Sequence, residues 1–214
     1  MGPSSPAAPV PILGLRERSK RERRARIEEA ARQVFREKGF EAATTREIAA
    51  RAGVGTGTLF VYARDKRELL RMVFRDQLEE LSTTAFAGVP ADAPLLDQLL
   101  HVFRPRYAFW GADPRLSRHA VRETFGSRYG GEEDGKALPP TVYVLHDRLA
   151  ELILRNQAAG RIDVSLEPHV CARLLLDVYY NENREWIADP VPDIDDGIAR
   201  LREVLALALR AIVS

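Results

Sequence analysis

Residues 44–66 read TTREIAARAGVGTGTLFVYARDK and carry the signals for two short helices joined by a glycine turn. The hydroxyl of Thr44 can accept the backbone N–H of Glu47 while the Glu47 carboxylate accepts the backbone N–H of Thr44. This capping box fixes the start of the first helix. Gly53 ends that helix, because the left-handed conformation of a helix end carries no steric penalty in glycine. The pattern then predicts a second helix over about 56–62.

Further helices flank this pair on both sides. The basic run that starts at Arg16 leads into a helix that reaches Lys38 and ends at Gly39. Downstream, Asp65 and Glu68 are expected to form a second reciprocal capping box at the start of a helix that enters the rest of the chain. This order predicts a three-helix unit of the helix-turn-helix type, although short helix pairs around a glycine are also common structural elements of all-α proteins.

The charge distribution favours DNA binding over a purely structural role. Residues 16–71 hold sixteen lysines and arginines against nine acidic residues, a net charge of +7, whereas residues 75–214 hold sixteen against twenty-two, a net charge of −6. The net charge of +1 for the whole chain conceals this division. Because affinity for duplex DNA grows with the number of phosphates that the protein neutralises, the basic end is the part expected to bind DNA.

The residues of this end resemble a known family. The segments RIEEAARQVFREKGF, TTREIA, AGV and GTLF, with Lys66 after them, are similar to the amino-terminal domain of tetracycline-repressor-type (TetR) regulators, over about residues 20–75. The resemblance implies a ligand-responsive homodimer that binds a palindromic operator, most simply as a repressor. Two positions depart from the family pattern, because Phe60 stands where a tyrosine is usual and Ala63 where an aromatic residue is usual. Tyr62 could replace the missing phenol.

The resemblance also implies roles for single residues. Thr45, Thr58 and Lys66 match positions that contact phosphate, Arg46 and Thr56 match positions that can contact base edges, and Gly57 would lie against the DNA backbone. The full set of residues expected at the DNA is Thr44, Thr45, Arg46, Gly55, Thr56, Gly57, Thr58, Phe60, Tyr62 and Lys66.

The sequence predicts an all-α protein with an N-terminal three-helix helix-turn-helix DNA-binding domain and a larger helical domain for ligand binding and dimerisation. We expect a disordered N-terminal tail over 1–15, the DNA-binding domain over 16–65 and the larger domain over 66–214. In the larger domain, Pro105 is expected to kink or split a helix. A flexible, glycine-rich acidic loop is expected over 126–138.

Two helices near the carboxyl end, predicted over about 166–188 and 193–213, carry many apolar residues. The core of a monomer could absorb them. The family resemblance implies instead a homodimer through these helices. The dimer would hold its two DNA-binding domains (residues 16–65 of each copy, here called the reading heads) about 34 Å apart on the DNA. Leu201 and Leu205 are expected in the shared face. An effector in the larger domain would change the separation of the heads and release the operator.

Aromatic and polar side chains of the central helices could line a site for an apolar or aromatic effector, although core packing is the better explanation of any single one. The candidate ligand-binding residues are Phe103, Tyr107, Trp110, Phe125, Tyr143, His146, Tyr179 and Asn183. Three arginines, Arg104, Arg106 and Arg122, could pair with an anionic group of the ligand or remain at the surface.

Other functional classes find little support. GVGTG at residues 53–57 lacks the spacing of a nucleotide-binding loop, DIDDG at 193–197 lacks that of an EF-hand, and the four histidines follow no metal-binding motif. No catalytic group, metal or cofactor is therefore expected, and Cys171 is expected to be an inert buried thiol. No apolar run approaches a membrane span, so a cytoplasmic protein is expected. A helical interaction scaffold without DNA binding remains the alternative, ahead of an enzyme without recognisable motifs.

Overall fold

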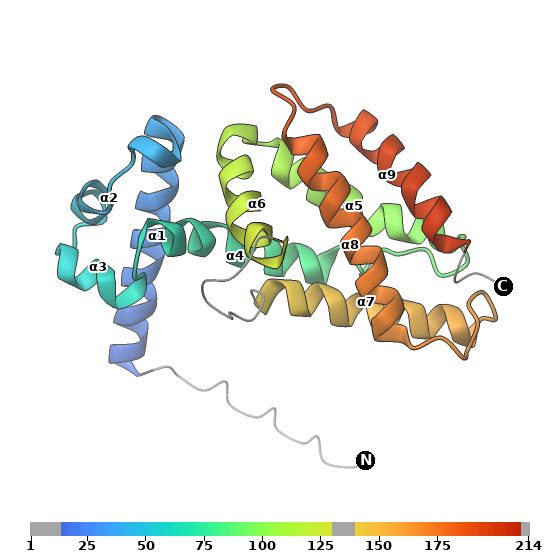
Figure 1. Cartoon of the computed structure of the whole chain (residues 1–214). Helices are drawn as coiled ribbons and strands as arrows, with labels where there is room; N and C mark the ends of the chain where they lie inside the picture. Colours follow the sequence, from blue (N-terminus) through green and yellow to red (C-terminus); the bar gives the residue numbers. More distant parts are fainter. Residues whose placement is uncertain (1–13, 130–139, 211–214) are drawn as a thin grey trace, which may run out of the picture.

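The computed structural model of the protein describes residues 14–129 and 140–210, and the side chains of all of these except 123–129, 140 and 141. This part of the chain folds into nine α-helices (Figure 1). The tail predicted over 1–15 lies outside the described residues except at its end, where Leu15 already begins a helix rather than continuing the tail. No helix of the described part is long and apolar enough to cross a membrane.

The first three helices lie together at one end of the molecule (Figure 1). They are α1 (Leu15–Ala42), α2 (Thr45–Arg51) and α3 (Thr56–Tyr62). The helical path of α1 breaks at Gly39, as predicted, because this residue has φ 78° and ψ 167°. α1 packs on α2 and α4, and the side chains that it buries form the core of this end: Ile27, Ala30, Ala31, Val34 and Phe35.

The turn between α2 and α3 matches the sequence prediction closely. Gly53 has φ 65°, and the N–H of Val54 donates to the Ala49 carbonyl at 3.0 Å, which closes the end of α2. α3 begins at Thr56, and Leu59 is its fully buried residue. One buried leucine on a seven-residue helix leaves most of the helix surface facing solvent.

The fourth helix, α4 (Lys66–Thr84), runs from this end into the second group of helices (Figure 1). The Asp65 carboxylate caps it by accepting the Glu68 N–H at 2.7 Å, as predicted. The reciprocal half of the predicted box is wrong, because the Glu68 carboxylate accepts the N–H of Arg64 instead of that of Asp65. The side chain of Glu68 therefore ties down the residue before the cap as well.

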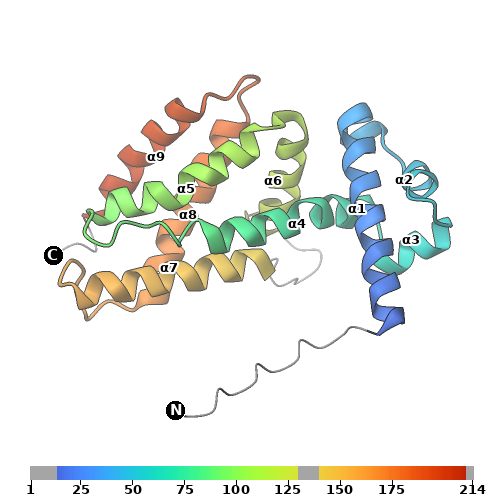
Figure 2. The same ribbon diagram turned by 180° about the vertical axis from the view of Figure 1, so that it is seen from behind.

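Five helices form the larger group: α5 (Leu95–Gly111), α6 (Pro114–Tyr129), α7 (Pro140–Ala158), α8 (Pro168–Ile187) and α9 (Ile194–Leu209). α7 packs on α4 and α8, and α9 packs across α5 and α8 (Figure 2). Pro105 lies inside α5 without splitting it, since the helix is continuous to Gly111. α6 extends to Tyr129, so the first four residues of the loop predicted over 126–138 are helical. The rest of that predicted loop, 130–138, lies outside the described part.

Helices α8 and α9 contribute to the monomer core. Leu201 and Leu205, which the sequence analysis placed in a shared face between two copies, are fully buried inside the single chain. That expectation was wrong for these two leucines, because α9 turns the stripe that contains them toward α5 and α8.

Gly197 allows α9 to approach its neighbours closely. A Cβ atom built on Gly197 would lie 2.6 Å from Cδ1 of Trp186 and 2.7 Å from Cε1 of Tyr107, both ring atoms of buried side chains. The glycine of the DIDDG segment therefore serves helix packing.

We predict that Gly197→Ala destabilises the fold by about 1–3 kcal/mol, the usual cost of overpacking a core. Urea unfolding should show it as a lower midpoint. Gly57→Ala is the matched control, because its Cβ would meet no atom within 4 Å and alanine favours a helix. Equal stability of the wild type and Gly197→Ala would contradict this packing argument.

Candidate nucleic-acid interface

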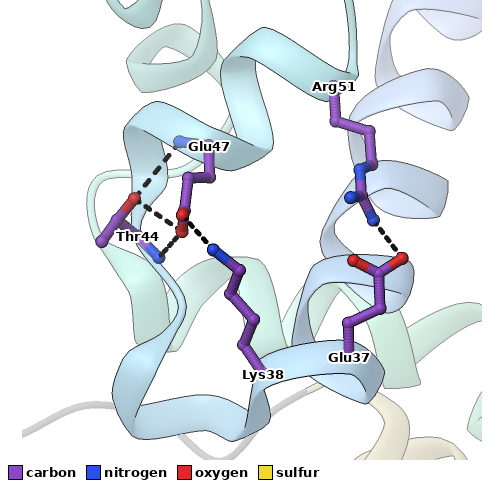
Figure 3. Close-up of polar contacts among 5 residues, drawn as sticks. All are labelled: Glu37, Lys38, Thr44, Glu47 and Arg51. Carbon is purple, nitrogen blue, oxygen red and sulfur yellow. Dashed lines mark hydrogen bonds and ion pairs between the residues drawn. The ribbon is translucent and has the colours of Figure 1, made fainter.

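The start of α2 is held by a network of polar contacts (Figure 3). The Thr44 hydroxyl accepts the Glu47 N–H at 3.3 Å, and the Glu47 carboxylate accepts the Thr44 N–H at 3.2 Å, which is the predicted capping box. The same carboxylate pairs with Lys38 of α1. Arg51, at the end of α2, pairs with Glu37 of α1 at 2.5 Å. Both ends of α2 are therefore tied to α1 by charge.

These contacts lower the pKa of both carboxylates, Glu37 and Glu47. The Lys38 ammonium, followed by the Thr44 hydroxyl, lowers the pKa of Glu47 from its ordinary value. The Arg51 guanidinium lowers the pKa of Glu37 in the same way. Both carboxylates stay charged at neutral pH, and both ion pairs are at the surface, where each contributes little alone.

The predicted DNA contacts lie on the outer side of α2 and α3. Arg46, Gly55, Thr56 and Gly57 are exposed, and Thr45 and Thr58 are half-buried. Phe60 is 44% exposed and beside Val61, which is 78% exposed. Arg46 forms no ion pair with any residue that the structure describes, so its guanidinium is available to a ligand.

Two predicted phosphate contacts have intramolecular partners. Nζ of Lys66 donates to the Glu41 carbonyl at 2.9 Å and lies 4.6 Å from the centre of the Phe40 ring. The Tyr62 hydroxyl lies 3.5 Å from the Lys20 carbonyl, at the outer limit of a hydrogen bond. In the free protein, both side chains therefore form hydrogen bonds to backbone carbonyls of α1.

An aromatic cluster fills the space between α5 and α8. The rings of Phe103 and Tyr179 stack with centres 4.4 Å apart, and Trp110 Nε1 donates to the Tyr179 hydroxyl at 3.3 Å. Tyr107 packs on Trp186 with ring centres 4.6 Å apart. Burial raises the pKa of Tyr107, which keeps its hydroxyl protonated.

Polar atoms in and beside this cluster lack partners. Asn183 is fully buried, and neither its Oδ1 nor its Nδ2 has a hydrogen-bond partner; the Tyr107 hydroxyl also lacks one. Arg106 is only 3% exposed, and its Nη1 donates to the Ser82 hydroxyl at 3.1 Å. Its guanidinium lies 5.8 Å from the Tyr179 ring centre, and no carboxylate of the described residues pairs with it. A buried cation without a counter-ion is costly, so this is a place where an anionic group would be stabilised.

The structure brings together five of the eight predicted ligand-binding residues: Phe103, Tyr107, Trp110, Tyr179 and Asn183. The side chain of Phe125 lies outside the described part. Tyr143 is 46% exposed on α7. His146 lies apart from the cluster, with its ring 5.2 Å from that of His169.

The pairing of His146 with His169 was not predicted, because 23 residues separate them and no motif joins them. Their nitrogen atoms and a carboxylate oxygen of Asp147 lie within 4.8 Å of one another. Among the described residues, these three are the group that could hold a metal ion. His146 Nε2 also lies 3.0 Å from the His169 carbonyl, a contact that stabilises the pair without a metal.

A second unpredicted feature is a cavity of about 550 Å³ where α1 meets α6 and α8. Of the three arginines that the sequence analysis considered for an anion, only Arg122 lines it. Arg104 pairs with Asp195 at 2.5 Å on the surface. The helical spacing of the arginines of α6 was the signal in the sequence that could have indicated this cavity. Their contact with α8 is tertiary, and the sequence alone does not show it.

Comparison with known proteins agrees with the geometry of the first three helices. Residues 27–73 match the model of a family described as bacterial regulatory proteins, tetR family. These residues include the rear part of α1, all of α2 and α3, and the first half of α4. This segment of the chain is thus similar to the tetR family of bacterial regulatory proteins.

The fold of nearly the whole chain recurs in solved structures. The Thermus thermophilus FadR repressor in complex with lauroyl-CoA superposes with a TM-score of 0.67 at 23% identity, over 87% of this chain and 93% of that one. A TetR-family regulator from Pectobacterium atrosepticum has a TM-score of 0.68 at 20% identity, over 94% of this chain and 98% of that one. At these identities the similarity extends to the fold alone.

One curated relative is a fatty acid metabolism regulator protein of Bacillus subtilis (strain 168), 24% identical over 100 residues. The aligned region spans 47% of this chain and about half of the relative, 52%.

The lowered pKa of Glu47 predicts a pH dependence of stability. Because the folded state holds this proton more weakly than the unfolded chain does, the contribution of Glu47 is present above the ordinary pKa of 4.5 and is lost as pH falls below it. Glu47→Gln should therefore lose less unfolding free energy than the wild type between about pH 6 and 3. Urea unfolding across this range measures it, with Glu79→Gln as the exposed control. Parallel wild-type and Glu47→Gln profiles would contradict this role for the carboxylate.

Proposed function

We propose that this TetR-family protein is a transcriptional repressor that binds palindromic operator DNA as a homodimer and leaves it when a small effector binds. The observation that carries the proposal is the α2–α3 pair, with its capping box at the start of α2 and its exposed polar residues, set in the basic end of the chain. In this reading, residues 16–65 are the DNA-binding domain and 66–214 the effector and dimerisation domain. A repressor acts on DNA in the cytoplasm.

The DNA contacts follow from position and exposure. Arg46 and Thr56 stand at the starts of α2 and α3, where exposed side chains can enter a major groove and reach base edges. Thr45, Thr58 and Lys66 would contact phosphates, and the remaining predicted residues would line the same surface. Lys66 must exchange the Glu41 carbonyl for a phosphate or reach both, which its three N–H donors permit.

Two substitutions test this division between contacts to base edges and contacts to phosphates. Arg46→Ala should weaken operator binding by about 1–3 kcal/mol more than binding to random duplex, the value of a bidentate contact to guanine. Lys66→Ala should weaken binding to both duplexes alike and lower the salt slope by about one unit. Fluorescence anisotropy on duplexes selected from a random pool, at several salt concentrations, measures both. Equal losses on the two duplexes for Arg46→Ala would make it a phosphate contact, and no binding to any duplex would refute the function.

The dimer would form through the outer sides of α8 and α9. Val170 and Leu174 of α8 are 52% and 40% exposed, and Leu207 of α9 is 61% exposed. These apolar side chains, rather than the buried Leu201 and Leu205, are the ones free to meet a second copy. A four-helix contact between two such pairs is a common way to build a symmetric dimer.

We predict that Leu174→Glu combined with Leu207→Glu converts the dimer to a folded monomer. Two charges on each copy would have to lose water at the contact, and the cost is doubled by symmetry. Sedimentation velocity measures the mass, and circular dichroism checks that the helices remain. Leu154→Glu, at a similarly exposed leucine of α7, is the control. A folded double variant that still sediments as a dimer would place the contact elsewhere.

The effector site we propose is the aromatic cluster between α5 and α8. Its apolar rings suit an apolar or aromatic body, while Arg106, Tyr107 and Asn183 offer buried polar atoms that lack partners. Relatives of the same fold have been solved in complex with lauroyl-CoA and stearoyl-CoA. These complexes support a small amphipathic effector, and an acyl-CoA is the class to test first.

A further inference from the structure

The cavity where α1 meets α6 and α8 connects the two parts of the molecule. Gly39 and Phe40 come from the end of α1, and the other walls come from α6 and the carboxyl end of α8. Its volume of about 550 Å³ is within the range of small-molecule sites. The lining residues are basic or apolar: Arg115, Arg118, His119, Arg122 and Arg184, with Phe40, Val121, Ile187 and Ala188.

The positive charge of this cavity exceeds the negative charge beside it. Among the described residues, Glu41 lies 3.8 Å from both His119 and Arg122, and Glu185 lies 3.1 Å from Arg184. Arg115 and Arg118, which also line the cavity, form no ion pair with a residue in the described ranges, so their positive charges are not offset there. The imbalance favours a ligand with two or more negative charges over a single carboxylate.

Two of the arginines show how a ligand could be held. Arg118 donates to the carbonyls of Ile187 and Asp189 at 2.7 and 2.5 Å, which fixes its guanidinium at the carboxyl end of α8 without neutralising it. Arg115 forms no ion pair with any residue in the described ranges, and its Nη2 lies 3.9 Å from the Cβ position of Gly39. Planar guanidinium groups on several sides are the arrangement that binds phosphate oxygens in pairs.

The apolar wall indicates that the ligand is more than an inorganic ion. Phe40 is buried, and its ring lies 5.1 Å from the His119 ring, so an aromatic surface stands beside the arginines. Val121 and Ile187 are likewise buried behind the cavity. A phosphate in the arginine half would leave room for an apolar group on this wall.

We propose that this cavity binds a phosphorylated small molecule, with its phosphates on Arg115 and Arg122 and an apolar group against Phe40. The cavity is separate from the aromatic cluster between α5 and α8. Because its walls belong to both the reading head and the larger domain, such a ligand binds best in one relative orientation of the two. Its effect on DNA binding rests on the function proposed above, whereas its binding does not.

The first experiment measures binding without DNA. Inorganic pyrophosphate is titrated by calorimetry into the full-length wild type and into Arg115→Gln combined with Arg122→Gln. Both residues are exposed, so the variant should keep the wild-type circular dichroism and melting temperature. We expect binding in the wild type and at least tenfold weaker binding in the variant.

The control is Arg148→Gln, which removes an arginine of α7 that pairs with Glu151 away from the cavity. It should bind pyrophosphate as the wild type does. No heat in the wild type, or equal affinity in all three proteins, would overturn the proposed site. An unfolded double variant would be replaced by each single substitution under the same criteria.

Two further ligands distinguish the source of the phosphate. ADP carries a pyrophosphate on a nucleoside, and octyl phosphate carries one phosphate on an alkyl chain. The ligand that binds more tightly than pyrophosphate identifies the apolar group, provided that it loses this advantage in Phe40→Leu while that variant keeps the wild-type circular dichroism and its affinity for pyrophosphate. If neither exceeds pyrophosphate, the role of the apolar wall is overturned.

A final measurement separates this site from the proposed function. Affinity for the selected duplex is measured with and without a saturating concentration of the tightest ligand. A severalfold change supports the coupling, and an unchanged affinity overturns it. Failure of the protein to bind any duplex would refute the function while the calorimetric result for the cavity stands.

Discussion

The arrangement of the two parts of this molecule depends on the backbone at Gly39. With φ at 78°, the chain leaves the helical path of α1 in a conformation that a residue with a Cβ rarely adopts. Phe40 is thereby directed into the junction, where its ring meets Phe35, His119 and the ammonium of Lys66. One aromatic ring thus contacts α1, α4 and α6 at once. The cavity of the arginines opens beside it, so the same turn that closes the reading head also shapes the boundary with the larger domain.

Much of the reading head could be predicted because its signals are local. The box between Thr44 and Glu47 spans four residues, and Gly53 acts on its own backbone, so both can be recognised without knowing the tertiary fold. The same holds for Asp65 as a cap. The wrong prediction at Glu68 is also local. Its carboxylate had two backbone N–H groups within reach, those of Arg64 and Asp65, and it accepts the one of Arg64. Local rules identify the helix start more reliably than the partner of each side chain.

The larger domain was less predictable because its features depend on which helix covers which face. Periodicity places Leu201 and Leu205 on one apolar stripe, yet it does not say whether that stripe faces a second copy or, as in this structure, α5 and α8 of the same chain. Tyr143 and Tyr107 are equally aromatic in the sequence, and only the fold separates a surface ring from a core ring. The cavity required arginines of α6 to meet the end of α8 some 65 residues away. No pattern within one helix contains that information.

The path of α4 has a mechanical consequence. This helix starts at the reading head with Lys66 and ends in the larger domain, and its 19 residues give a rod about 28 Å long at 1.5 Å per residue. A tilt of only about 10° at the inner end would displace the outer end by about 5 Å, by the geometry of a rod of that length. In the proposed dimer the two displacements would add, to about 10 Å against a half-site spacing of about 34 Å. If the protein binds DNA as the proposed dimer, a rearrangement no larger than a side-chain repacking around the inner turns of α4 would be sufficient to carry the two DNA-binding domains out of register with consecutive major grooves.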